Sequence, residues 1–322
     1  MEIKPVFEFI LWDNCNNHCT FCPQREKCNN LNVFQKANVL KKVIEFLDSD
    51  KYVKGSHILL VGGEIFDNTD GLWSLTQDCE KLSIWCDFID AICNKMIIGD
   101  IDLLYVNTNL LYNDHRLLNW LLVRASQLEL YSRLKFTTSY DLEGRFHTKE
   151  REELFLNNLK ELKSPEVVSH DMNIVVNTIL TKKTCEAILN DEFNPKEFCD
   201  EYKCDINLIP YIIYNEDLSA EPVDVLKALA HTDGLIEGYL GKYYHNFNLK
   251  QDKLLYKYNP LKNEFEYCSS NKLDCGHYEN FKLWTKKKDK CFICCLHEFM
   301  SLMAGWGEQY GSIYTIWIME RL

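Results

Sequence analysis

Apolar, β-branched segments alternate with longer segments of helical period over residues 1–214 of this 322-residue chain. The strand-like segments are residues 6–12, 57–61, 103–108, 134–139, 172–179 and 205–209. Amphipathic stretches lie between them, at residues 34–47, 72–94, 117–126, 149–162 and 184–190. This order predicts βαβ units, which build a parallel sheet with right-handed crossovers. The predicted fold class is therefore α/β, as a partial (βα)6 TIM-type barrel.

The alternation stops near residue 214. Acidic residues at 216–224 begin a predicted helix over 225–230, and a cysteine-rich segment and an apolar tail at 299–322 follow. We therefore divide the chain into a barrel, residues 1–214, and a small Cys-rich C-terminal domain, residues 215–322, packed against it. The predicted metal-binding segment of that domain is residues 268–295.

The composition limits the cellular compartments and the classes of partner that suit this chain. The N-terminus lacks the apolar segment of a secretory signal, and no apolar run approaches the ~18 residues of a membrane span. Fifteen cysteines without such a signal indicate a reducing compartment, so we expect a cytoplasmic protein that enters no membrane. The net charge of −12 disfavours nucleic acid as a partner, because neutralising phosphates dominates nucleic-acid affinity.

Three cysteines follow the first strand directly. Cys15, Cys19 and Cys22 have the spacing C-x3-C-x2-C, and Phe21 precedes the third. Three thiolates on one short loop can hold three corners of an iron–sulfur cube and leave the fourth iron without a protein ligand. The spacing alone also allows a chance cluster or half of a zinc site, because C-x2-C is a zinc pattern too.

Polar or glycine residues end the other predicted strands. Residues 59–66, LLVGGEIF, end the second strand with Gly62, Gly63 and Glu64. Glycine lets a ligand approach the backbone closely, although a Gly-Gly pair can also be a simple turn. In a parallel barrel the carboxyl ends of the strands meet at one rim. We expect the polar or strand-ending residues of the later strands at that rim: Asn109, Ser139, Asp141, Asn177, Ile209 and Pro210.

The cysteine spacing and the Gly-Gly-Glu segment one βα unit later together resemble the signature of the radical S-adenosylmethionine (SAM) enzymes, over about residues 6–211. The resemblance implies a [4Fe–4S] cluster on Cys15, Cys19 and Cys22, with SAM on the open iron. It implies reductive cleavage of SAM to a 5′-deoxyadenosyl radical, which abstracts hydrogen from a substrate. It also implies a one-electron reductant such as flavodoxin or ferredoxin.

The same resemblance implies contacts to SAM. Gly62, Gly63 and Glu64 would contact the methionine amino group. Ser139 and Asp141 would reach the ribose or the carboxylate, and Asn177 the ribose. The remaining implied cofactor-binding residues are Phe21, beside the cluster, and Ile209 and Pro210, beside the adenine. A helix cap, a core-facing amide or a plain strand end is the alternative for these later residues.

The C-terminal cysteines form two pairs, with Cys295, His277 and His297 nearby. Four thiolates can enclose Zn²⁺ or a second [4Fe–4S] cluster. Radical SAM enzymes often carry a Cys-rich SPASM or twitch extension with an auxiliary cluster, and the short spacing here is similar to the twitch form. Unliganded buried thiols are the third alternative. The four predicted ligands are Cys268, Cys275, Cys291 and Cys294.

The other cysteines are expected to pack in the core. They are Cys28, Cys79, Cys86, Cys93, Cys185, Cys199 and Cys204. A peptide or protein is the first expectation for the substrate, because an auxiliary cluster is compatible with peptide modification. Modification of a nucleotide, nucleoside or nucleic-acid base is the alternative. A non-catalytic Cys-rich metal or electron-transfer protein would explain the thiols but not the Gly-Gly-Glu segment.

Overall fold

The computed structural model describes four segments in full, residues 5–20, 31–74, 83–162 and 172–208, together with the single residue Cys22. It also describes single residues between 218 and 232, and the backbone alone of residues 209–210, 255–259 and 264–268. The predicted sites at Phe21, Cys275, Cys291 and Cys294 lie outside these residues, as do Cys28 and Cys79.

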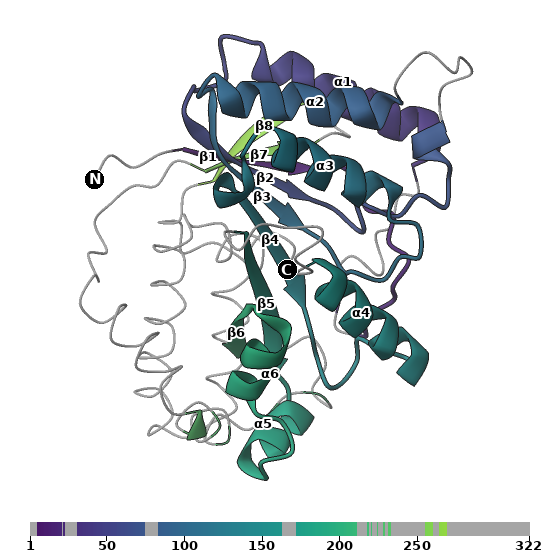
Figure 1. Ribbon diagram of the computed structural model, residues 1–322, viewed down its shortest axis with the longest axis vertical. Helices are drawn as coiled ribbons and strands as arrows, with labels where there is room; N and C mark the ends of the chain where they lie inside the picture. Colours follow the sequence, from purple (N-terminus) through teal and green to yellow (C-terminus); the bar gives the residue numbers. More distant parts are fainter. Residues whose placement is uncertain are drawn as a thin grey trace, which may run out of the picture.

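Six consecutive parallel strands make up most of the eight-stranded sheet formed by the described residues, in the order β6-β5-β4-β3-β2-β1-β7-β8 (Figure 1). Every neighbouring pair from β1 to β6 is parallel, which confirms the predicted α/β class with six strands. The six strands are β1 (Val6–Ile10), β2 (Ser56–Val61), β3 (Ile101–Asn107), β4 (Leu134–Ser139), β5 (Asn173–Leu180) and β6 (Asp205–Pro210).

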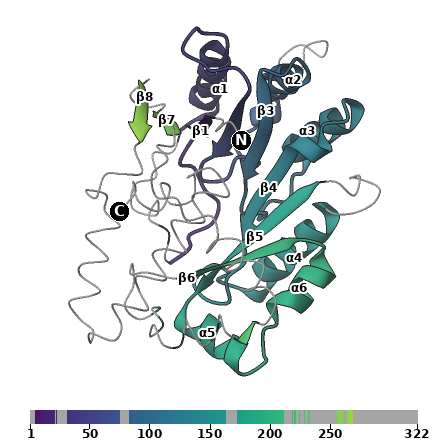
Figure 2. The ribbon, with the colours of Figure 1, turned by 90° about the vertical axis from the view of Figure 1, so that its left-hand side faces the viewer.

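Helices alternate with these strands, and α1 to α4 lie along one face of the sheet (Figures 1 and 2). A polar side chain caps the start of α1 and of α2. Asn32 forms a capping box with Gln35 at the start of the first helix, and such a box satisfies two otherwise unpaired groups of the first turn. The α-helices within the described residues are α1 (Val33–Leu47), α2 (Ile84–Ile97), α3 (Arg116–Gln127), α4 (Lys149–Leu162), α5 (Lys182–Leu189) and α6 (Pro195–Tyr202).

Two helix predictions need correction. The single helix predicted over residues 72–94 is instead a short 3-10 turn, η1 (Leu72–Ser74), and the separate helix α2. The second helix begins at Ile84 because the Ser83 hydroxyl accepts a hydrogen bond from the backbone N–H of Cys86. Helix α6 was not predicted, although Asn194 caps it and Pro195 occupies its first turn, a common helix-start pattern.

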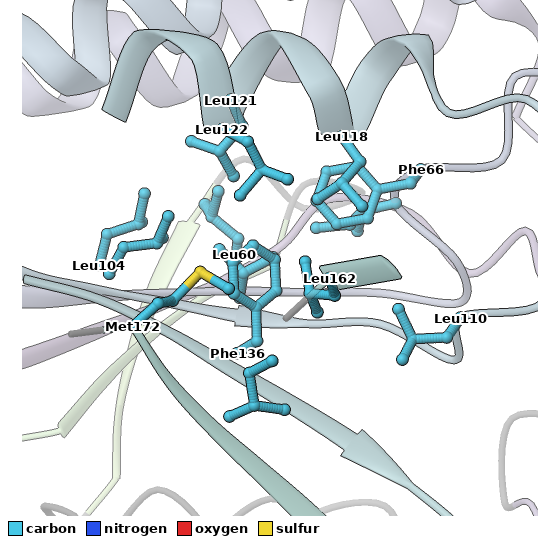
Figure 3. Close-up of a cluster of buried hydrophobic side chains, with 14 of the residues drawn as sticks. Leu60, Phe66, Leu104, Leu110, Leu118, Leu121, Leu122, Phe136, Leu162 and Met172 are labelled. Atoms are coloured by element: carbon cyan, nitrogen blue, oxygen red, sulfur yellow. The ribbon is translucent and has the colours of Figure 1, made fainter. Parts of the chain in front are cut away.

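The main hydrophobic core fills the space between the sheet and the helices. Leu60, Leu104 and Phe136 from three strands face Leu118 and Leu121 of α3 (Figure 3). Side chains alternate along a strand, so the intervening residues belong to the other face. There Val6, Ile10, Leu59 and Val61 form a second, smaller cluster. Burial of both faces of β1 explains why apolar residues occupy both faces in its sequence, interrupted by the buried Glu8.

The predicted C-terminal domain contributes two strands to this same sheet. Strand β7 (Leu255–Asn259) pairs in parallel with β1, and β8 (Glu264–Cys268) pairs antiparallel with β7. The register matches Cys268 with Leu255, and Leu255 with Val6 at the start of β1. Among the described residues, no helix is long and apolar enough to span a membrane.

Candidate functional site

The loop after β1, residues 11–20 with Cys22, lies against the carboxyl end of β2; we refer to it as the cysteine loop. Leu11 donates its backbone N–H to the Val61 carbonyl at 2.9 Å, and Gly63 donates to the Trp12 carbonyl at 2.8 Å. Glu64 donates to the Asn14 carbonyl, also at 2.8 Å. The β1–β2 pairing therefore continues past the strand ends and fixes the cysteine loop at the edge where the predicted site residues collect.

Glycine is required at position 63 for this contact. A Cβ added at Gly63 would lie 2.0 Å from the Asn14 carbonyl oxygen and 2.6 Å from that of Asp13, and one at Gly62 would lie 2.6 Å from the Trp12 oxygen. Sequence reasoning assigned this space to an approaching ligand. In the structure the backbone of the cysteine loop occupies it, so the two glycines bring the predicted cluster loop and the Gly-Gly-Glu segment together.

Glu64 is fully buried and joins the end of β2 to the end of β3. Its carboxylate accepts hydrogen bonds from the backbone N–H of Phe66 at 2.9 Å and of Asn109 at 2.5 Å. The Thr108 hydroxyl donates to it at 2.9 Å. Burial raises the pKa of Glu64 to about 7, although these three hydrogen bonds oppose the shift. Glu64 thus positions Asn109, one of the predicted rim residues.

Two side-chain amides donate to the cysteine sulfurs. Asn109 Nδ2 lies 3.5 Å from the Cys15 sulfur, and Asn17 Nδ2 lies 3.1 Å from the Cys19 sulfur. The backbone of the third cysteine is fixed as well, since Cys22 donates its N–H to the Cys19 carbonyl at 3.1 Å. Donors of this kind stabilise charge on sulfur. Sequence reasoning placed Asn109 at the rim but did not single out Asn17.

Cys19 is buried, Cys15 and Cys22 are half-buried, and the three thiols interact with one another. Burial raises the pKa of Cys15 to about 12, and the negative charges of Glu64, Cys19 and Cys22 raise it further. Burial also raises the pKa of Cys19, whereas the positive charge of Arg145 lowers it. The structure thus gathers the three predicted thiols, with a cation beside them, in one partly desolvated region.

That cation comes from the loop between β4 and α4. Arg145 Nε lies 2.5 Å from an Asp141 oxygen, and both side chains are buried. The other Asp141 oxygen accepts the backbone N–H of Ile179 at 2.6 Å, which ties this pair to β5. Asp141 was a predicted SAM contact, and here its two oxygens hold Arg145 and β5. Arg145 was not predicted, although its position four residues after Asp141 suited an ion pair.

Further contacts fasten the cysteine loop to the same region. Thr20 donates its N–H to the Gly144 carbonyl at 2.8 Å, and His147 Nε2 lies 2.8 Å from the His18 carbonyl oxygen. Arg151, in the first turn of α4, donates to the Asn16 carbonyl at 3.0 Å. These residues were not singled out from sequence, because their partners lie more than 120 residues away along the chain.

The last two predicted strand ends lie at the same edge. Ser139, Asn177 and Asn207 are in register on β4, β5 and β6, and Asn207 Nδ2 donates to the Asn177 side-chain oxygen at 3.1 Å. The backbones of Ile209 and Pro210 pair with Ile179 and Leu180. The structure brings these residues to the predicted edge, and their contacts with SAM stay predictions.

The first of the C-terminal cysteines predicted to bind metal lies at the opposite end of the strands, level with the start of β1. Cys268 ends β8 beside Leu255, in line with the start of β1, whereas the cysteine loop follows the end of β1. A strand of five residues spans about 16 Å, so the Cys268 backbone is separated from the cysteine loop by at least that length. The other three predicted ligands lie outside the described residues.

No single-ion metal site is present among the described residues, since no three or more His, Cys, Asp or Glu side chains are grouped to hold a metal ion. One ion needs ligands that converge on a point, whereas the thiolates of a cubane bind different irons. Three thiols on one loop, amide donors on two sulfurs and a buried guanidinium match the chemistry of a cluster. This donor set, rather than a closed cage, is the basis for considering iron–sulfur binding.

The predicted packing role of the other described cysteines is confirmed for four of them, which are buried: Cys86, Cys93, Cys185 and Cys204. Cys199 is half-buried.

No protein-family model matches the chain, and no curated protein matches it in sequence. The function is therefore argued from the residues at the carboxyl edge of the sheet.

Proposed function

We propose that this chain is a radical SAM enzyme with a partial (βα)6 barrel, in which the cysteine loop binds a [4Fe–4S] cluster. One observation supports the proposal most directly. The loop that carries the three cysteines of the C-x3-C-x2-C spacing lies at the carboxyl edge of the parallel strands, and its backbone pairs directly with the Gly-Gly-Glu end of β2. Functional groups collect at this edge in parallel α/β folds.

Cys15, Cys19 and Cys22 would hold three irons of the cluster, which when bound would supply the electron for reductive cleavage of SAM. The amides of Asn17 and Asn109 donate to two of the three sulfurs. The protein orients the cofactor, while the cofactor performs the difficult chemical step.

The Gly-Gly-Glu segment fixes the cysteine loop and places the carboxyl end of β2 beside it. We assign SAM to the adjoining edge, with its methionine amino group toward residues 62–64 and its ribose toward Ser139 and Asn177. Phe21 would lie beside the cluster, and Ile209 and Pro210 beside the adenine. Asp141 supports the site indirectly, because its oxygens already hold Arg145 and the backbone of β5.

The proposed partners are a one-electron donor such as flavodoxin or ferredoxin and, as substrate, a peptide or protein; modification of a nucleotide or nucleoside is the alternative. We retain a cytoplasmic location, because a labile cluster needs a reducing environment. Cys268, Cys275, Cys291 and Cys294 are proposed to hold a second [4Fe–4S] cluster or Zn²⁺.

Reconstitution tests the central proposal. The full chain is loaded anaerobically with iron and sulfide, reduced with dithionite and mixed with SAM, and 5′-deoxyadenosine is measured. The parent should form it, and the triple variant Cys15→Ala, Cys19→Ala, Cys22→Ala should not. A control with Cys86→Ala and Cys93→Ala removes two buried thiols from α2 and should retain the activity.

Three results would reject the proposal. Full 5′-deoxyadenosine formation by the triple variant would show that the cysteine loop is not the cluster site. A parent that binds iron and sulfide yet never cleaves SAM would instead be a non-catalytic electron-transfer protein. Zinc in place of iron at the cysteine loop would make the loop a structural site.

A further inference from the structure

The loop between β4 and α4 brings a buried cation to the cysteine loop. Asn17 Nδ2 donates both to the Cys19 sulfur at 3.1 Å and to the Arg145 carbonyl at 3.3 Å, so one amide joins the two loops. Thr20 adds a backbone bond to Gly144 at 2.8 Å. Through these contacts the position of Arg145 is fixed relative to the thiol of Cys19, and the backbone bond from Cys22 to the Cys19 carbonyl at 3.1 Å holds Cys22 beside Cys19.

The charge of Arg145 acts on those thiols. Burial alone would lower the pKa of Arg145, yet the negative charges of Cys19, Asp141 and Cys22 raise it above its usual value. Asp141 is the anchor, because its carboxylate contacts the guanidinium at 2.5 Å and the backbone N–H of Ile179 at 2.6 Å. An anchored, buried charge is screened less by salt than an exposed one.

A fixed positive charge beside cluster ligands has a defined physical effect. Adding one electron makes a thiolate-ligated cluster more negative, so a nearby cation stabilises the reduced form. Net charge and hydrogen bonds to the sulfurs are the terms by which a protein sets the potential of an iron–sulfur cluster. The amides of Asn17 and Asn109 act in the same direction.

We propose that Arg145 is a positioning residue that raises the reduction potential of the cluster at the cysteine loop, and that Asp141 holds it in place. This inference rests on the proposed function. It assigns Arg145 and Asp141 a role in how easily the site accepts an electron. The role is separate from any contact with SAM, so it is measurable without SAM.

The test is an anaerobic redox titration of the reconstituted full chain without SAM, followed by EPR of the reduced cluster. Arg145→Met keeps much of the side-chain volume and removes the charge. This substitution should shift the one-electron equilibrium of the cluster about tenfold toward the oxidised form, which corresponds to a reduction potential about 59 mV lower than that of the parent. Arg145→Lys keeps a charge there and should remain within about threefold of the parent.

Two further variants keep the test decisive. Arg116→Met is the matched control, because Arg116 also pairs with an aspartate, Asp114 at 2.6 Å, but is exposed and outside the cysteine loop; its potential should equal that of the parent. The double variant Asp141→Asn, Arg145→Met leaves no unpaired buried charge. It should fold even if Arg145→Met does not, and should shift the equilibrium about threefold in the same direction.

The outcomes separate the two proposals. If the parent assembles a cluster and both Arg145→Met and the double variant retain its potential, the role of Arg145 is wrong while the proposed function stands. An equal shift in Arg116→Met would overturn it too, because the effect would then be nonspecific. If the parent assembles no cluster at the cysteine loop, the proposed function fails first.

Discussion

Replacing Gly63 with alanine tests whether the cysteine loop is built on a close backbone contact. The new Cβ would lie 2.0 Å from the Asn14 oxygen and 2.4 Å from its carbonyl carbon, where ordinary contacts begin near 3.4 Å. The atoms met belong to backbone, so no side chain can rotate away. The cysteine loop must therefore move by more than an ångström or the end of β2 must distort.

The expected loss of stability follows from that displacement. Overpacking of a close-packed site costs about 1–3 kcal/mol. Movement of the cysteine loop also weakens the Gly63–Trp12 and Glu64–Asn14 hydrogen bonds, each worth about 0.5–1.5 kcal/mol. We expect a total of about 4 kcal/mol, a large part of the roughly 5–15 kcal/mol that holds a typical domain folded.

Urea unfolding followed by tryptophan fluorescence measures this loss, because Trp12 and Trp85 are buried. Gly99→Ala is the control: nothing lies within 4 Å of its added Cβ, and its φ of +81° gives a backbone strain of about 1–2 kcal/mol. The reasoning is refuted if Gly63→Ala loses no more free energy of unfolding than Gly99→Ala, at an unchanged urea slope.

Three other changes give measurable outcomes. Burial raises the pKa of Glu64 to about 7, so the folded chain keeps this proton to a higher pH than the unfolded chain does. The free energy of unfolding of the parent should therefore fall by about 3 kcal/mol between about pH 4.5 and about pH 8. Glu64→Gln should abolish that slope in urea titrations, and a persistent slope would assign it to other groups. Phe136→Ala, at a fully buried core position, should lose about 3–5 kcal/mol in the same assay, and a loss under about 1 kcal/mol would place it outside the core. In the triple alanine variant of Cys15, Cys19 and Cys22, metal analysis should still find either about four irons with sulfide or one zinc per chain. A further Cys291→Ala substitution should remove that metal. If neither metal is found in the triple variant, the proposed C-terminal metal site is rejected.

The sequence was sufficient for the order of strands and for the edge where the site lies. Periodicity placed strands β1 to β6 to within a few residues, because burial on one or both faces leaves a local pattern, whereas β7 and β8 were not predicted. Parallel pairing then brings Cys15, Glu64 and Asn109 to the same edge whatever the details of packing. Local patterns failed at residues 72–94, where a Ser83 cap divides the predicted helix, and at the unpredicted helix α6.

The contacts that shape the site were decided only by the tertiary structure. Gly63 touches Asn14, 49 positions earlier in the numbering of the chain, and Asn17 reaches Arg145 across 128 residues. The pairing of β7 with β1 joins Leu255 to Val6, which are far apart in the sequence, in the same way. Periodicity records whether a residue is buried but not which residue it meets, since the partner depends on how the whole sheet closes. The cysteine spacing therefore indicated the kind of chemistry, and folding supplied the buried Asp141–Arg145 pair beside it.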